Sequence, residues 1–187
     1  MTAGILSVIL SFVLLKQTPP PQYFPKGSFG KTEKLSKFSE DWYSKDLRAF
    51  DEPSLLEASK DKSRESYRFL FLRSFRHSIC IRLDVNTDGS GLLTTKMLSG
   101  ATGEVKTRII LNEQEKFTKK QVDWFVSRKQ ISEFWNQPSF DEQRGLDGEE
   151  WIAEGVKAGN YHVAARWSPT EGTAYAIGTL MLRTAKL

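Results

Sequence analysis

Residues 145–169 hold most of the side chains in this sequence that acid–base chemistry would use. Glu154, His162 and Arg166 lie within this stretch. A carboxylate beside an imidazole raises the imidazole pKa and positions the ring as a general base, and a guanidinium binds anionic substrate groups. These three residues are therefore candidate catalytic residues of a small hydrolase-like enzyme. Their acidic and aromatic neighbours are candidate binding residues, namely Asp147, Trp151, Tyr161 and Trp167.

The register of a predicted hairpin, residues 151–167, decides whether the three candidates meet. Side chains alternate between the two faces of a strand, so a shift of one residue moves a whole set to the other face. If Glu154 pairs with Val163, His162 lies on the opposite face. If a bulge shifts the pairing, Glu154 lies opposite His162, and Arg166 shares that face. The same residues would also suit an ion-pair network between the hairpin and the C-terminal helix.

A second pattern suggests a weak calcium site. Asp84, Asn86 and Asp88, followed by Gly89, reproduce the first half of an EF-hand loop, in which oxygen ligands alternate along the chain. Thr95 stands where that loop needs a bidentate glutamate. A hairpin turn rich in Asn, Asp and Gly explains the residues without metal. We therefore expect no cofactor.

The residues around the hairpin also resemble a known group of proteins. Residues 145–169, and more loosely residues 67–75 and 52–55, are similar to an uncharacterised family of small, apparently exported bacterial proteins with no assigned activity. The resemblance covers much of the chain after residue 50. It implies a bacterial envelope protein and carries no reaction with it.

The pattern of apolar residues predicts the elements that must position these side chains. Alternating segments and Gly-rich turns indicate a mainly antiparallel sheet of about six strands, packed with helices in a single α+β domain. The predicted strands are residues 67–75, 78–85, 92–98, 105–111, 151–156 and 161–167. Helices are expected at 38–50, after Pro53, after Thr118 with a break near 128–130, and at 174–182. Cationic residues alternating with apolar ones suggest that one face of the sheet is in water, namely Arg68, Arg73, Arg82 and Lys96.

The N-terminus predicts three parts of the chain. Residues 3–15 are apolar, and Lys16 follows them, which is typical of a signal peptide or short membrane anchor over residues 1–16. Residues 17–37 contain prolines and glycines and are predicted to be a tether. Residues 38–187 are then long enough for one domain with a core of its own. This arrangement predicts an exported protein of the bacterial periplasm or cell envelope.

Charge and composition exclude several classes of function. The formal net charge of +4 is spread among 23 acidic residues, so no concentrated basic stripe is available for nucleic acid. The single cysteine, Cys80, forms no internal disulfide, and His77 and His162 lack the spacing of a zinc site. The predicted partners are the membrane, through the N-terminal segment, and an unknown envelope protein or glycan. The leading hypothesis is therefore a non-enzymatic binding, interaction or structural domain, and the alternative is the hydrolase-like enzyme.

Overall fold

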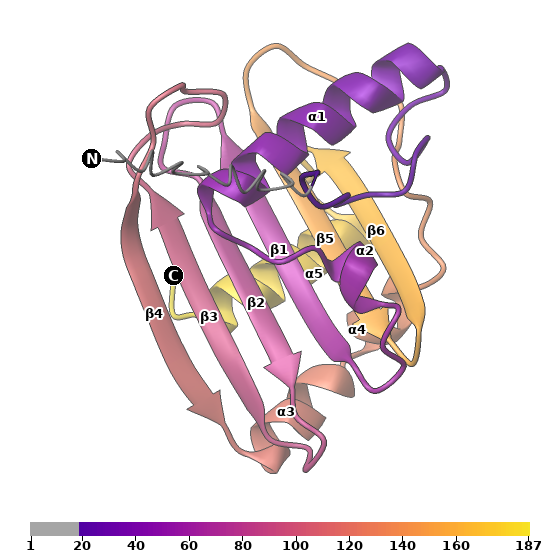
Figure 1. Cartoon of the computed structure of the whole chain (residues 1–187), viewed down its shortest axis with the longest axis vertical. Coiled ribbons are helices and arrows are strands. Elements are labelled where there is room, and N and C mark those ends of the chain that lie inside the picture. Colours follow the sequence, from indigo (N-terminus) through magenta and orange to yellow (C-terminus); the bar gives the residue numbers. More distant parts are fainter. Residues whose placement is uncertain (1–18) are drawn as a thin grey trace, which may run out of the picture.

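A computed structural model of the chain describes residues 19–187 (Figure 1). Six strands form one sheet, and helices cover both of its faces, so the predicted single α+β domain is confirmed. The strands are β1 (Glu65–Arg73), β2 (Ile79–Val85), β3 (Gly91–Leu98), β4 (Ile109–Phe117), β5 (Glu149–Lys157) and β6 (Asn160–Trp167). The helices are α1 (Glu33–Ala49), α2 (Leu55–Ala58), α3 (Lys119–Val126), α4 (Lys129–Phe134) and α5 (Gly172–Thr184).

The strand order places β1 at the centre of the sheet. Strands β1 to β4 form an antiparallel meander, and β5 returns to pair with the free side of β1 before the hairpin to β6. The resulting order is β4-β3-β2-β1-β5-β6, so β4 and β6 are the two edges. Because β1 is hydrogen-bonded on both sides, its side chains meet those of both β2 and β5.

Each face of the sheet has its own apolar core. Phe69 and Trp151 point toward α3, α4 and α5, where Phe125 is fully buried. At Gly178 of α5, an added Cβ atom would lie 2.4 Å from the Trp151 ring, so glycine allows the helix to approach the sheet closely. On the other face, α1 contributes Leu47 to a second core. The domain therefore has three layers, helix, sheet and helix (Figure 1).

The segment predicted to be a tether is part of the folded domain. Tyr23, Phe24 and Phe29 are almost completely buried in the core beneath α1. Thr32 then caps the N-terminus of α1, because its side chain accepts a hydrogen bond from the Leu35 amide. The predicted boundary at residue 38 is therefore wrong. Two adjacent aromatic residues, and a third five positions later, gave no periodic signal, although each of them is buried.

Most predicted elements lie where the sequence placed them, and β4 is the main exception. The Thr118 cap of α3 and the break between α3 and α4 agree with the expected helix and its interruption. Residues 105–111 were expected to form the fourth strand, whereas β4 spans Ile109–Phe117. Val105 is 88% exposed in the preceding turn. The strand was not recognised in the sequence because most residues of β4 are polar, and an edge strand needs few buried side chains.

The N-terminal leader or anchor predicted for residues 1–16 lies outside the described residues. Among residues 19–187, no helix is both long and apolar enough to cross a membrane.

A buried ion pair joins the two central strands. Arg68 of β1 is directly opposite Glu154 of β5, and both side chains are fully buried. The Arg68 Nη2 and Glu154 Oε2 atoms are 2.6 Å apart, and Tyr161 donates a hydrogen bond of 2.9 Å to the other carboxylate oxygen. Arg68 also donates to the Pro53 carbonyl at 2.7 Å. Burial alone would lower the pKa of Arg68, but the carboxylate of Glu154 raises it, so the guanidinium keeps its charge.

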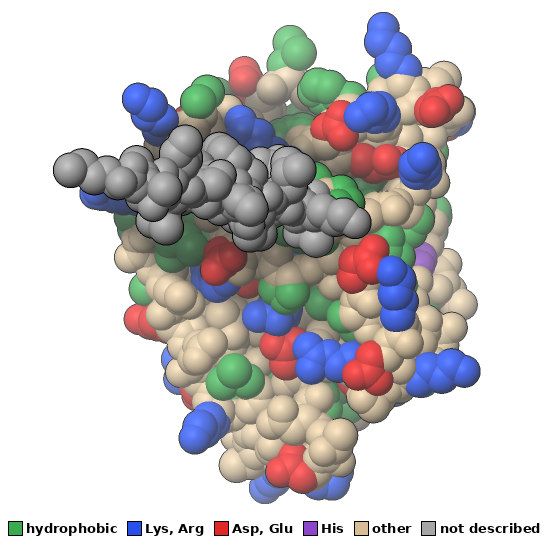
Figure 2. Space-filling view, in the orientation of Figure 1, with side chains coloured by type: hydrophobic (Ala, Val, Ile, Leu, Met, Phe, Trp, Pro, Cys, Tyr) green, Lys and Arg blue, Asp and Glu red, His purple; other side chains and the backbone are tan. Residues whose placement is uncertain are grey.

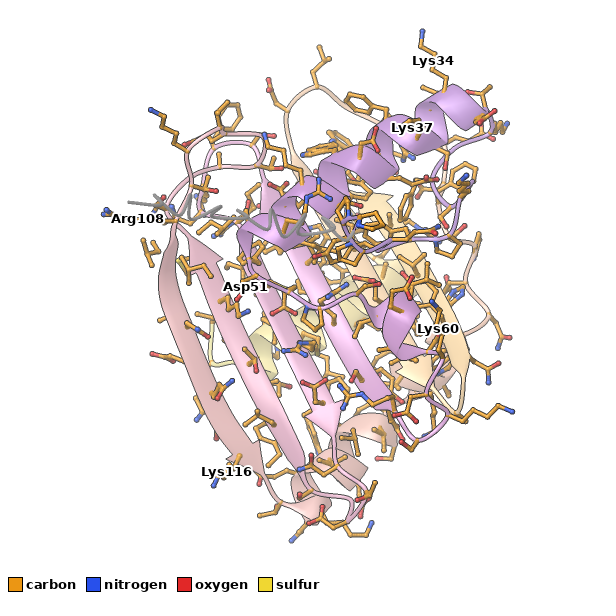
Figure 3. The ribbon with its side chains drawn as sticks, in the orientation of Figure 1. Lys34, Lys37, Asp51, Lys60, Arg108 and Lys116 are labelled. Carbon is orange, nitrogen blue, oxygen red and sulfur yellow. The ribbon has the colours of Figure 1, made fainter. Side chains whose placement is uncertain are left out.

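Glu52, in the connection between α1 and α2, extends this pair into a network. Its carboxylate lies 2.9 Å from Arg82 Nε and 2.9 Å from Lys96 Nζ, and 3.5 Å from Arg68. Lys96 also donates to the carbonyl of Asp51, which is labelled at the turn after α1 in Figure 3. The chain between the two helices is thereby held against the sheet.

This network corrects the prediction that the cationic face is in water. Arg68 is 1% exposed and Lys96 is 7% exposed, because α1, α2 and their connection cover that part of the face. Arg73 lies on the opposite face from Arg68, since five positions separate them along β1. Over the rest of this side of the molecule, acidic and basic side chains are intermixed (Figure 2).

Removing one charge of the network should destabilise the domain strongly. Arg68→Met leaves the buried carboxylate of Glu154 without its cation, whereas Glu52 keeps Arg82 and Lys96. We therefore expect the free energy of unfolding to fall by about 3–5 kcal/mol. Lys157→Met breaks an exposed pair with Glu65 across the same two strands, and should cost less than about 1 kcal/mol. Urea unfolding followed by tryptophan fluorescence measures both. Similar losses in the two variants would contradict this account.

Candidate functional site

The hairpin adopts the register that separates the predicted catalytic residues. Glu154 pairs with Val163, and His162 pairs with Gly155. Glu154 therefore faces α1, while His162 faces α4 together with Arg166. The turn between the strands has only two residues, Ala158 and Gly159, whose φ angles are +51° and +83°, and such a turn needs no bulge. The predicted cluster of Glu154, His162 and Arg166 is not formed. The arrangement on which the hydrolase-like alternative depended is therefore absent from this hairpin.

His162 instead packs on α4, and Arg166 holds the segment that follows this helix. The His162 ring packs against Phe134 with a centroid distance of 4.8 Å, and its burial lowers the pKa of the imidazole. Arg166 donates to the Pro138 carbonyl at 2.9 Å and lies 3.4 Å from the Asp141 carboxylate. Arg166 thus fixes residues 138–141, and the Ala165 amide donates a hydrogen bond to the Ser139 carbonyl of the same segment.

The four predicted binding residues lie in different environments. Trp151 is buried between the sheet and α5, and Tyr161 is bonded to Glu154 inside the fold. Asp147 is exposed on the loop that precedes β5. Only Trp167 lines a cavity. The structure therefore does not bring the four together.

The predicted calcium ligands also point to separate partners. The Asp84 carboxylate lies 2.8 Å from Arg82, and Asp88 accepts two hydrogen bonds from Ser90. The Asn86 amide also donates to Ser90, which forms an ordinary turn between β2 and β3. Within residues 19–187, no three His, Cys, Asp or Glu side chains are arranged to hold a metal ion.

A cavity of about 420 Å³ lies at the end of the sheet where α1 meets the loop before β5. Its apolar walls come from segments far apart in the sequence, with Leu35, Phe38, Trp42, Phe140, Leu146 and Trp167 among them. Phe38 is 67% exposed and Leu146 is fully exposed, although both are large apolar side chains. Figure 2 shows hydrophobic side chains at this upper end of the molecule. The volume is typical of pockets for small ligands.

Helix α1 supplies one wall of the cavity. Leu35, Phe38 and Trp42 are three and four positions apart and so lie along one side of the helix. The Trp42 indole donates to the Thr102 hydroxyl at 2.7 Å, and Thr102 donates to Asp46 at 2.7 Å. These bonds fix the orientation of the indole ring. Phe38 lines the cavity mouth rather than the core beneath α1.

The loop before β5 supplies the opposite wall. Gly145 lies so close to Trp167 that an added Cβ atom would be 1.9 Å from the indole ring. Gly148 pairs with the end of β1, because Ser74 donates both its amide and its hydroxyl to the Gly148 carbonyl. The wall formed by Gly145 and Trp167 is therefore closely packed, and it is anchored to the sheet.

Glu150, at the start of β5, provides a buried charge at the cavity. It is 6% exposed, and its Oε2 atom has no hydrogen-bond partner among the described residues. Burial raises the pKa of Glu150, while a hydrogen bond with Tyr43 and the charge of Arg144 act in the opposite direction. Four carboxylates and two cations line the cavity in total. An unpartnered buried oxygen in an acidic, apolar cavity can accept a hydrogen bond from a ligand.

Glu150 lies within the stretch of residues 145–169 singled out in the sequence, but it was given no role there, and the α1 wall was not predicted. Two features of the sequence could have indicated them. Glu150 is an acidic residue next to Trp151, where a predicted strand begins, and α1 carries more apolar residues than are needed to cover one face of the core.

Comparisons with known proteins assign no relative to this chain: no family model, no curated protein and no solved structure matches it. The resemblance to exported bacterial proteins stays a prediction. Function must therefore be argued from the geometry of the cavity and the surface.

The raised pKa of Glu150 predicts how the free energy of unfolding depends on pH. A carboxyl with a higher pKa in the folded protein than in the unfolded chain destabilises the fold as it ionises. Stability is therefore lost as pH rises from the unfolded value, about 4.3, through the folded value. Glu150→Gln should match the parent protein at low pH and exceed it at neutral pH. Urea unfolding at a series of pH values measures the difference.

Glu113→Gln removes an exposed carboxylate of β4 and controls for the loss of a charge. A difference between Glu150→Gln and the parent that stays constant over the whole pH range would contradict the assignment of a buried, destabilised carboxylate.

Proposed function

We propose that the chain is a non-enzymatic binding domain whose ligand occupies the cavity between α1 and the loop before β5. The observation that carries the proposal is the Glu150 Oε2 atom, which is buried without a hydrogen-bond partner beside large exposed apolar side chains. A buried acceptor without a donor costs free energy, and a ligand that supplies the donor recovers it.

The cavity favours one class of ligand. Lys31 pairs with Glu142, and Arg144 lies 3.7 Å from Asp141, so the cations of the lining are matched by carboxylates. Glu149 and Glu150 remain as excess negative charge. The apolar walls favour an apolar or aromatic body, and the excess charge favours an amine or another hydrogen-bond donor at its end. A ligand with a terminal carboxylate would be repelled.

We also infer that the domain works at the cell envelope, where an envelope protein or glycan could present such a group. The support is the apolar stretch at residues 3–15 and the three exposed prolines at 19–21 that precede the first buried residue of the domain, Tyr23. The resemblance to apparently exported bacterial proteins points the same way.

Three ligands with one apolar body and different ends test the proposed chemistry. Phenylbutylamine, phenylbutanol and phenylbutanoate are titrated into the full chain, and binding is followed by calorimetry and by tryptophan fluorescence, since Trp42 and Trp167 line the cavity. We expect the amine to bind most tightly and the carboxylate most weakly. Glu150→Gln should weaken amine binding about tenfold, which corresponds to one charge-assisted hydrogen bond.

Glu113→Gln, which lies outside the cavity, should leave all three affinities unchanged. The proposal fails if none of the three ligands binds, or if the carboxylate binds as tightly as the amine.

A further inference from the structure

The helical layer on the α5 side of the sheet contains a groove between α3 and α5. The groove has a volume of about 780 Å³, and its floor includes Phe117 at the end of β4 and Leu180 of α5. Both of these side chains are 7% exposed and belong to the core. Helices α4 and α5 pack against each other, whereas the groove separates α3 from α5. The layer is therefore open between α3 and α5.

Aromatic side chains form the rims of the groove. Trp124 of α3 is 49% exposed, and Tyr175 of α5 is 39% exposed. Tyr175 stacks on the buried Trp151 with a centroid distance of 5.4 Å, and Arg128 lies 4.0 Å from the centre of the Trp124 ring. Both exposed rings are therefore held in place by neighbours. Fixed tryptophan, tyrosine and arginine side chains are the residues that contribute most to protein interfaces.

The groove is strongly cationic. Four cations and one carboxylate line it. The carboxylate, Glu115, pairs with Lys186 at 3.0 Å. Lys120 and Arg183 have no carboxylate within 4.0 Å among the described residues, and they stand on opposite rims. This charge is opposite to that of the ligand cavity, so the two sites require different partners.

We propose that this groove binds an amphipathic helix of a partner protein that carries acidic residues on its flanks. A helix laid between α3 and α5 would bury apolar side chains against Phe117 and Leu180, which completes the layer. Its acidic flanks would meet Lys120 on one rim and Arg183 on the other. The concave shape favours a helix over a bilayer, because a flat lipid surface contacts the rims and leaves the floor uncovered.

A synthetic peptide tests the proposal on the full chain. The probe is a fluorescein-labelled helix of about 15 residues, with leucine and phenylalanine at helical spacing and glutamate on both flanks. Fluorescence anisotropy should show binding that weakens as salt is added. Lys120→Glu combined with Arg183→Glu should weaken binding at least about tenfold, and Trp124→Ala should weaken it without changing the circular dichroism.

Two controls separate this site from general electrostatic attraction. Lys60→Glu combined with Lys157→Glu changes the net charge equally at exposed sites outside the groove, and should leave the affinity nearly unchanged. A peptide with lysine in place of glutamate should not bind. The proposal is overturned if the acidic peptide does not bind or binds both double variants alike. It is also overturned if only phosphatidylglycerol vesicles bind, since the surface would then be a membrane contact.

Discussion

The rest of this structure depends on one buried guanidinium, that of Arg68, in the middle of the sheet. Arg68 has no access to water, and an isolated buried charge costs several kcal/mol. It must therefore be matched from both sides, by Glu154 on the neighbouring strand and by Glu52 on the connection above. The first requirement ties β1 to β5 in one register. The second holds the α1–α2 connection against the sheet, although that connection contains no regular structure.

The cavity between α1 and the loop before β5 depends indirectly on this buried charge. Glu52 lies shortly after the end of α1, so its pairing with Arg82 and Lys96 positions the C-terminal end of that helix. The row that includes Phe38 and Trp42 is then presented to the loop before β5 as a rigid wall. Binding residues on regular elements are held more precisely than residues on loops, and here the rigid wall comes from a helix fixed by buried charges.

The sequence predicted the elements well and their mutual arrangement less well. Strand alternation and the Thr118 cap are local signals, and apart from β4 the corresponding elements lie where they were predicted. The prediction of which face of the sheet meets water was wrong. Alternation around Arg68 shows that the two faces differ, but it does not show which of them is exposed. The cavity was missed for a related reason. Glu150 and Trp42 are more than a hundred positions apart, and only the strand order brings them together. The hairpin register was narrowed to two alternatives, and the short turn decided between them.

The two outer strands have a consequence for how copies of this protein behave in a crowded compartment. An exposed strand edge is a template for further strands and hence for aggregation. In β4, Glu113 and Glu115 face one side of the sheet while Lys116 faces the other, so an incoming apolar strand would meet charge on both sides. In β6, the amide of Ala165 is already bonded to Ser139. Charge on β4 and the bonded amide of β6 thus make both edges of the sheet poorer templates for an incoming strand.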